Sequence, residues 1–372
     1  MNKKFNFFLS ALFCAFLGGM LAVSTLLPDR EFSPLENRNL QKPPKLSVEA
    51  LSDGKFMTEA EAYVSDHLVG RDLWVAMKAW SERLTGKQEN NGVYFGKENT
   101  LINRLDIPNQ ENLEQNMEHV DKLVSNVDVP VYFGLIPSSA AIWGGRLPAG
   151  APTADEKALI HRLYGMTRAE TIDLYGALDE RKDEDIYYRT DHHWTSLGAF
   201  YGANALFGAM GLEPIHLEDY QKTTVSTDFN GTIFSSSGVR WLPPDQIDTY
   251  IPGEGVKVTS YFGAEPEKGS LYVDSYLEVK DKYSYFLGGR QPLCVIENPQ
   301  AEGPKVLVIR DSYSDSLAPF LTQRFSQVHL FDPRNNLNSI QAYVEGNGID
   351  AVVVLYSISN FATDKNLFLL GR

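Results

Sequence analysis

Residues 305–314 read Lys305-Val306-Leu307-Val308-Ile309-Arg310-Asp311-Ser312-Tyr313-Ser314, an apolar run that stops abruptly on Asp-Ser. A near-continuous run of Val, Leu and Ile is typical of a strand buried on both faces of a parallel sheet. Reactive groups in such sheets collect at the carboxyl ends of strands, where the next helix directs backbone N–H groups at the site. Ser312 therefore stands where a nucleophile is expected, and its amide can help to hold an oxyanion. The simpler alternative is that Ser312 only caps the helix that follows.

The rest of the chain repeats the order of strand and helix. Apolar strands are predicted at 129–138, 171–175, 328–331 and 349–356, and helices at 110–127, 154–164 and 195–210, the last with Ser196 as a candidate cap. This alternation predicts an α/β fold. The pattern also predicts helices within 47–86, a hairpin at 92–102 and a β-rich insertion at about 239–290.

The N-terminal segment is basic and then apolar. Lys3 and Lys4 are followed by no charged residue until Asp29, and about 20 apolar residues at roughly 1.5 Å each can span the hydrocarbon core of a bilayer. We expect residues 1–28 to form a signal anchor, with a cleaved signal peptide as the alternative. The basic flank then stays in the cytoplasm and the remaining chain is exported. We expect residues 29–45 to form a polar, proline-rich tether, and residues 46–372 to form the exported domain.

Composition excludes several classes of protein. The 372 residues, 43% of them hydrophobic, can build one large or two ordinary domains. A formal charge of -14 argues against a nucleic-acid binder, which needs a basic surface. The two cysteines, Cys14 and Cys294, leave no internal disulfide for the exported domain and argue against a thiolate zinc site or a Cys nucleophile.

A second group of reactive side chains is Thr190-Asp191-His192-His193-Trp194, in a chain with only seven histidines. On extended backbone, an Asp two residues before a His lies on the same face, so Asp191 can orient His193. His192 and Trp194 then face the other way as structural residues, and the two histidines do not share a metal ion. The alternatives are a half-buried histidine and an Asp191 that caps the next helix. With Ser312, the pair predicts a Ser-His-Asp hydrolase or acyltransferase.

The chain resembles the DHHW protein family, which is related to the SGNH-hydrolase-like catalytic domains of alginate O-acetyltransferases. The resemblance covers nearly the whole exported part, in the motifs at 35–38, 92–97, 191–194, 229–232, 280–289 and 310–313. It implies an SGNH-like three-layer sandwich with a mainly parallel central sheet over 46–372. The family's Asp-x-His pair corresponds to Asp191 and His193 and its strand-end serine to Ser312, while Arg310 occupies the glycine position of the usual Gly-Asp-Ser.

The resemblance implies an extracytoplasmic, membrane-anchored O-acetyltransferase or acetylesterase. It would act on a cell-surface polysaccharide through an acetyl-serine at Ser312, without a cofactor or metal and with a membrane-bound O-acyltransferase as a possible acetyl donor. Candidates for substrate binding or the oxyanion site are Arg334, Tyr313 and Trp194, although a surface salt bridge (Arg334) and core packing (Trp194) are alternative roles. The alternative function is a catalytically inactive polysaccharide-binding or scaffold protein of a surface-polysaccharide modification and export system.

Overall fold

The computed structural model describes residues 3–106, 108–263 and 265–372. The chain divides into two units. One consists of Met1–Asn91 and Phe234–Trp241, and the other of Gly92–Ile233 and Leu242–Arg372. This division is one of packing, and the expected split into anchor, tether and catalytic domain stays a prediction.

The first unit is mainly helical, as predicted for 47–86. Its elements are α1 (Lys3–Leu26), β1 (Phe32–Ser33), β2 (Arg38–Asn39), α2 (Val48–Ser52), α3 (Lys55–His67), α4 (Arg71–Leu84) and β3 (Glu89–Asn90). Among the described residues, α1 alone is long and apolar enough to cross a membrane, with a mean hydropathy of 2.1. That length and composition fit both an anchor and a signal sequence.

Part of the expected tether is folded onto α3. Arg38 Nη1 donates to Asp66 Oδ2 at 2.9 Å, and the backbone N–H of Gln41 donates to the same oxygen at 2.8 Å. Asp66 is buried, and a buried carboxylate requires such partners. These contacts hold the Asp66 pKa at about 2, because the hydrogen bond from Arg38 outweighs burial. The Asp66 carboxylate on α3 thus holds the segment from Arg38 to Gln41, which composition alone predicts to be part of an unfolded tether.

The second unit is built on an eight-stranded sheet in the order β11-β10-β12-β14-β13-β15-β6-β7. Five neighbouring strands, from β14 to β7, run parallel, and β12 pairs antiparallel with β14. The strands are β6 (Val131–Ile136), β7 (Glu170–Ile172), β10 (Lys257–Tyr261), β11 (Glu267–Lys268), β12 (Leu293–Glu297), β13 (Lys305–Arg310), β14 (Gln327–Phe331) and β15 (Ala351–Ser357). The mainly parallel sheet predicted from the sequence is confirmed.

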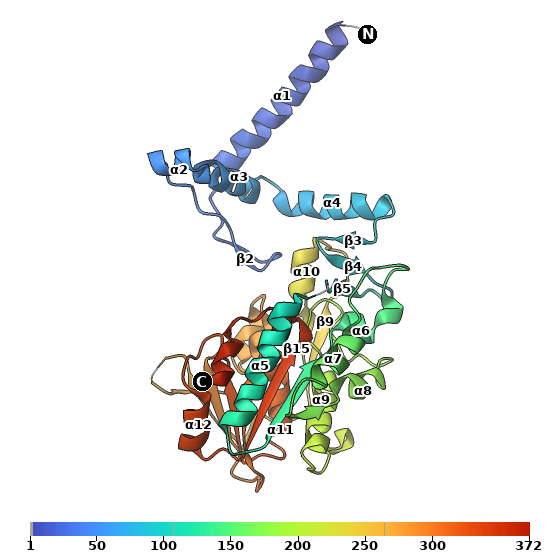
Figure 1. Ribbon diagram of the computed structural model, residues 1–372. Helices are drawn as coiled ribbons and strands as arrows, with labels where there is room; N and C mark the ends of the chain where they lie inside the picture. The colour runs from blue at the N-terminus through green and yellow to red at the C-terminus, as the bar shows by residue number, and fades with distance from the viewer. Residues whose placement is uncertain (1–2, 107, 264) are drawn as a thin grey trace. The chain divides into compact units, whose positions relative to one another are not determined.

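Helices cover both faces of this sheet. The alternating side chains of β13 explain why: Val306 and Val308 pack into one core with α9 and α11, whereas Leu307 and Ile309 pack into the other with α5 and α13. Helices α5 and α12 lie on one side of β15, and α8 and α9 lie on the other (Figure 1). The helices are α5 (Gln110–Asn126), α7 (Glu156–Tyr164), α8 (Leu174–Asp179), α9 (Ser196–Ala209), α11 (Tyr313–Leu321), α12 (Ile340–Asn347) and α13 (Ile358–Thr363). The result is a three-layer α/β/α sandwich.

Smaller elements complete this unit. The hairpin predicted at 92–102 is β4 (Val93–Phe95) paired with β5 (Leu101–Asn103). Within the predicted β-rich segment, β9 (Asp245–Thr249) pairs with β8 (Thr223–Phe229), while β10 and β11 extend the central sheet beyond β12. Helix α9 is capped by Thr195, whose Oγ1 accepts from the N–H of Gly198 at 3.3 Å, and not by Ser196 as expected.

Candidate active site

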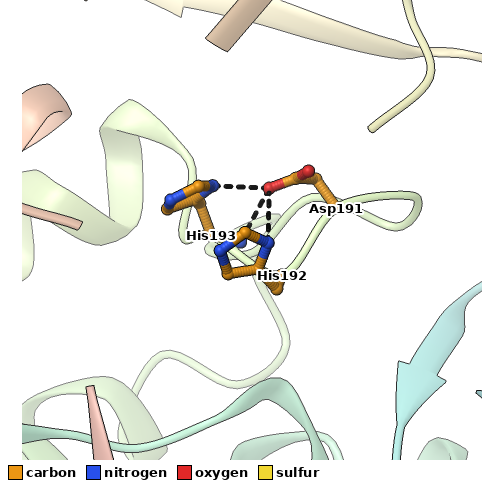
Figure 2. A group of neighbouring side chains, drawn as sticks. All are labelled: Asp191, His192 and His193. Carbon is orange, nitrogen blue, oxygen red and sulfur yellow. Dashed lines mark hydrogen bonds and ion pairs between the residues drawn. The ribbon is translucent and has the colours of Figure 1, made fainter. Parts of the chain in front are cut away.

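The Asp-His-His-Trp motif lies at the tip of a hairpin-like loop. Tyr188 N–H donates to the His193 carbonyl at 3.2 Å, and Thr195 N–H donates to the Ile186 carbonyl at 3.0 Å. The residues between are bends, not extended strand. The expectation that His192 faces away from His193 is therefore wrong: the two rings lie 3.8 Å apart, and Figure 2 shows both turned toward Asp191.

The loop is fixed by residues far away in the sequence. Thr190 donates to Asp245 Oδ2 through its N–H at 2.8 Å and its hydroxyl at 2.6 Å. Gly231 N–H donates to Thr190 Oγ1 at 3.1 Å. A Cβ on Gly231 would lie 2.2 Å from the Asp191 Cβ, so the backbone can approach Asp191 this closely only at a glycine. This explains one residue of the 229–232 motif.

Asp191 is buried and accepts four hydrogen bonds. Its Oδ1 accepts from His193 N–H at 3.0 Å and contacts His193 Nδ1 at 2.6 Å. Its Oδ2 accepts from the N–H and the hydroxyl of Thr232, at 2.7 and 2.9 Å. Burial alone would raise the pKa of this carboxyl, but the two adjacent histidines and these hydrogen bonds hold the pKa well below its ordinary value. Asp191 is therefore an ionised acceptor at neutral pH.

The ionised carboxylate defines the protonation of His193. Because it can only accept, His193 Nδ1 carries a proton, and the tautomer this selects in a neutral imidazole has its lone pair on Nε2. Nε2 lies 2.8 Å from Ser312 Oγ. The imidazole also stacks on the Tyr283 ring, with centroids 3.7 Å apart and planes 7° from parallel. Tyr283 in turn donates its hydroxyl to the Ser312 carbonyl at 3.1 Å, so it contacts both partners.

Ser312 lies between β13 and α11, at the carboxyl end of the strand. The preceding Asp311 is buried and accepts from the Ser357 N–H and hydroxyl at 2.9 and 2.7 Å, and from the Asn360 amide at 2.8 Å. These bonds tie the end of β13 to the end of β15. Within the described ranges, the Ser312 N–H has no hydrogen-bond acceptor. An unpaired amide at a helix start is a suitable donor to a developing oxyanion.

His192 and Thr232 extend the network beyond the three predicted residues. His192 Nδ1 lies 2.7 Å from Thr232 Oγ1. Since the Thr232 hydroxyl donates to Asp191, His192 Nδ1 is the donor in this contact. Burial, followed by the neighbouring His193, lowers the His192 pKa to about 4, so His192 is neutral at pH 7. The sequence reasoning missed Thr232, Gly231 and Tyr283, although the motifs at 229–232 and 280–289 contain them.

Two of the three candidate substrate contacts are buried. Trp194 is fully buried, and its indole N–H lies 2.9 Å from the Tyr313 carbonyl and 3.0 Å from Ser316 Oγ. Tyr313 is 3% exposed, and its hydroxyl donates to the His192 carbonyl. Neither side chain can contact a sugar in this structure, and the prediction for both is corrected: they join the histidine loop to α11.

Arg334 follows the end of β14, the neighbour of β13. Its Nε and Nη2 each lie 2.8 Å from a carboxylate oxygen of Asp332, which is buried. Its side chain is 21% exposed. The arginine thus forms the salt bridge that the sequence left open, at the strand-end edge of the sheet, and its contact with a substrate stays a prediction.

One group of side chains could also offer metal ligands. Asp191, His192 and His193 each supply a ligand atom, all within 4.8 Å of one another. The argument that adjacent histidines point apart does not exclude this site, because the loop is bent. However, both nitrogens of His193 and Nδ1 of His192 already contact Asp191, Ser312 or Thr232. An ion would have to displace these hydrogen bonds.

The three-layer sandwich is an SGNH-like fold, in which Ser312 lies at a strand end opposite the Asp-x-His loop. The family model described as "DHHW protein" matches residues 150–331, which contain the Asp-His-His-Trp loop. The matched stretch is just under half of the chain.

A curated relative is the "Probable alginate O-acetylase AlgJ" of Pseudomonas aeruginosa, 26% identical over 163 residues. The match spans 40% of this chain and 41% of that protein, less than half of its length. A solved DHHW family protein from Eubacterium siraeum has a TM-score of 0.66 and 24% identity, over 76% of this chain and 95% of that one. Bacillus cereus PatB1 with a sulfonyl adduct has a TM-score of 0.64 and 23% identity, over 75% and 98%. The two structures share the fold.

Proposed function

We propose that this protein is a serine O-acetyltransferase or acetylesterase, with Ser312 as the nucleophile, His193 as the general base and Asp191 as the residue that orients His193. The observation that carries the proposal is the continuous chain of contacts from Ser312 Oγ to His193 Nε2 at 2.8 Å and from His193 Nδ1 to Asp191 Oδ1 at 2.6 Å. A hydroxyl, an imidazole whose Nε2 faces that hydroxyl, and a buried carboxylate are the parts of a nucleophilic triad.

The chemistry proceeds in two balanced steps. Ser312 Oγ attacks the carbonyl carbon of an acetyl ester while its proton passes to His193 Nε2. The imidazolium gives this proton to the departing alcohol, which leaves Ser312 acetylated. A sugar hydroxyl or water then loses its proton to His193, attacks the acetyl-serine and releases Ser312 as the alcohol. In this proposal the Ser312 N–H binds the oxyanion in both steps.

The proposed substrate is a cell-surface polysaccharide, and the proposed site of action is outside the cytoplasm. The likeness to a probable alginate O-acetylase supports the choice of a polysaccharide acceptor. The length and hydropathy of α1 support a single-pass anchor with the second unit on the extracytoplasmic side. A membrane-bound O-acyltransferase is the proposed source of the acetyl group.

The first test is acetylation of the intact chain in detergent by p-nitrophenyl acetate. Release of nitrophenol and a mass increase of one acetyl group on the peptide containing Ser312 are expected, and both should disappear in Ser312→Ala. The matched control is Ser314→Ala, since Ser314 is buried and its hydroxyl has no partner among the described residues. Equal rates in Ser312→Ala and the native protein would remove Ser312 as the nucleophile.

An added oligosaccharide acceptor then separates transfer from hydrolysis. Acetylated oligosaccharide identifies a transferase, and free acetate alone identifies an esterase. If neither native protein nor variant reacts, while the folded protein binds the oligosaccharide, the proposal is refuted in favour of a polysaccharide-binding protein.

A further inference from the structure

Helix α4 exposes an apolar stripe along one face. Its five side chains are each at least 40% exposed: Leu73, Trp74, Met77, Trp80 and Leu84. Their spacing of one, three, three and four residues places them on one side of a helix. The opposite side packs inward, because Ala79 is fully buried and Val75 Cγ1 lies 3.2 Å from the Cβ position of Gly238. Within the stripe, Trp80 packs on Trp241 with ring centroids 4.3 Å apart, and the Trp74 indole N–H donates to the Val69 carbonyl at 3.1 Å. Both rings nevertheless stay at least 40% exposed.

A contiguous stripe of this kind marks a binding surface. Large apolar side chains scattered singly on a surface need no explanation, but a continuous patch indicates a partner. Two of the five are tryptophans, which are enriched where a bilayer meets water. Lys78, which is exposed, lies at the edge of the stripe on a helical projection, where a basic side chain can reach lipid phosphates.

The contacts of α1 identify what covers the stripe. Ser24, in the last turn of α1, accepts a hydrogen bond at 2.9 Å from the N–H of Val69, in the loop between α3 and α4. Just beyond α1, Arg30 forms an ion pair with Asp72 at 3.1 Å. The start of α4 is therefore bonded to the end of α1, an apolar helix long enough to cross a bilayer. That end is where hydrocarbon gives way to headgroups.

We propose that α4 is an interfacial helix, which lies along the surface of the membrane that α1 spans and inserts its apolar stripe between the lipids. This inference rests on the retention of α1 as an anchor, which is part of the proposed function. The occupant of the stripe is the lipid bilayer itself. Helix α1 across the membrane and α4 along its surface then fix the orientation of the first unit.

The test uses the full chain in phosphatidylcholine–phosphatidylglycerol vesicles whose acyl chains carry bromine, which quenches tryptophan at close range. We expect quenching of the native protein, and loss of most of it in the double variant Trp74→Phe/Trp80→Phe. Trp143 and Trp194 are buried and serve as an internal reference. The fifth tryptophan, Trp241, stacks on Trp80 and is replaced by phenylalanine in both proteins, so that the difference between them reports Trp74 and Trp80 alone. Phenylalanine keeps the stripe apolar, so circular dichroism and p-nitrophenyl acetate turnover should be unchanged.

Aqueous iodide distinguishes the other occupants. Membrane insertion predicts that Trp74 and Trp80 are protected from iodide and quenched by bromine. Quenching by iodide alone would mean that the stripe faces water, and protection from both would mean a second copy of the chain; either result overturns the proposal. Intact mass of the protein isolated from cell membranes reports separately whether α1 is retained, and Ser312 acetylation tests the proposed chemistry independently.

Discussion

Replacement of Asp191 by asparagine tests the proposed triad most directly. Both carboxylate oxygens accept from a backbone N–H, Oδ1 from His193 and Oδ2 from Thr232. An asparagine must place its NH₂ group against one of them, whichever way it turns. The lost hydrogen bond costs about 1–3 kcal/mol of stability, which leaves a typical domain folded.

The effect on catalysis should be much larger. The imidazolium that forms on His193 would lose a carboxylate partner; a unit charge pair about 4 Å apart at an effective dielectric of about 20 is worth about 4 kcal/mol. That corresponds to a rate loss of about 10³-fold. If the NH₂ group turns toward His193, the imidazole adopts the opposite tautomer, Nε2 can no longer take the Ser312 proton, and the loss approaches about 10⁴-fold.

The assay is kcat/KM for p-nitrophenyl acetate, with urea unfolding of the same preparation. The matched control is Asp155→Asn: Asp155 caps α7 by accepting from the Ala158 N–H at 3.0 Å, and asparagine caps equally well. A folded Asp191→Asn protein with activity within about tenfold of native would refute the proposed role of Asp191, since a loss of that size is below the charge-pair estimate.

Two further outcomes follow from buried polar groups. Thr232→Val keeps the backbone donor to Asp191 but removes the hydroxyl at 2.9 Å. Because a charged hydrogen bond is worth about 1.5–3 kcal/mol, kcat/KM should fall about 10- to 100-fold in this variant and recover in Thr232→Ser. Equal rates in both variants would exclude this role of the hydroxyl. His329 is buried, and burial lowers its pKa from 6.5 to about 4. The unfolded chain therefore binds this proton first, so the stability that neutral His329 contributes is complete above pH 6.5 and is lost as the pH falls toward 4, by up to about 3 kcal/mol. Urea unfolding should show a smaller loss between pH 7 and pH 4.5 in His329→Gln than in the native protein, and equal losses would contradict the assignment.

Local patterns predicted the scaffold and the three residues of the proposed triad. The run 305–310 is apolar from Val306 to Ile309 and ends on the buried Arg310, and it forms β13 between β14 and β15. The junction at Ser312 follows from the same run, because the end of a parallel strand is a property of the strand itself. Asp191 and His193 were paired by their two-residue spacing, although the structure joins them through a bent loop and not through extended backbone.

The supporting residues could not be predicted, because long-range contacts define them. Thr232 is 41 residues from Asp191. A threonine that follows a glycine is a common pattern, which does not by itself indicate a partner for Asp191. Tyr283 contacts His193 only because the chain returns from β10 and β11 to the carboxyl edge of the sheet. His192 was misplaced for a related reason: side-chain alternation applies to strands, and tertiary hydrogen bonds to Thr190 impose a bend instead.

Arg310 stands in the place of the usual glycine and forms a buried ion pair next to the proposed nucleophile. Its guanidinium is 1% exposed and lies 2.7 Å from Asp315 in the first turn of α11. Burial raises the Asp315 pKa to about 6, against the opposing effect of Arg310. The pair therefore links β13 to α11 beneath Ser312, and removal of one partner would leave a buried charge uncompensated. The Ser312 N–H has no acceptor in the described part of the chain, so this amide stays available as the proposed oxyanion donor although an arginine stands at the glycine position.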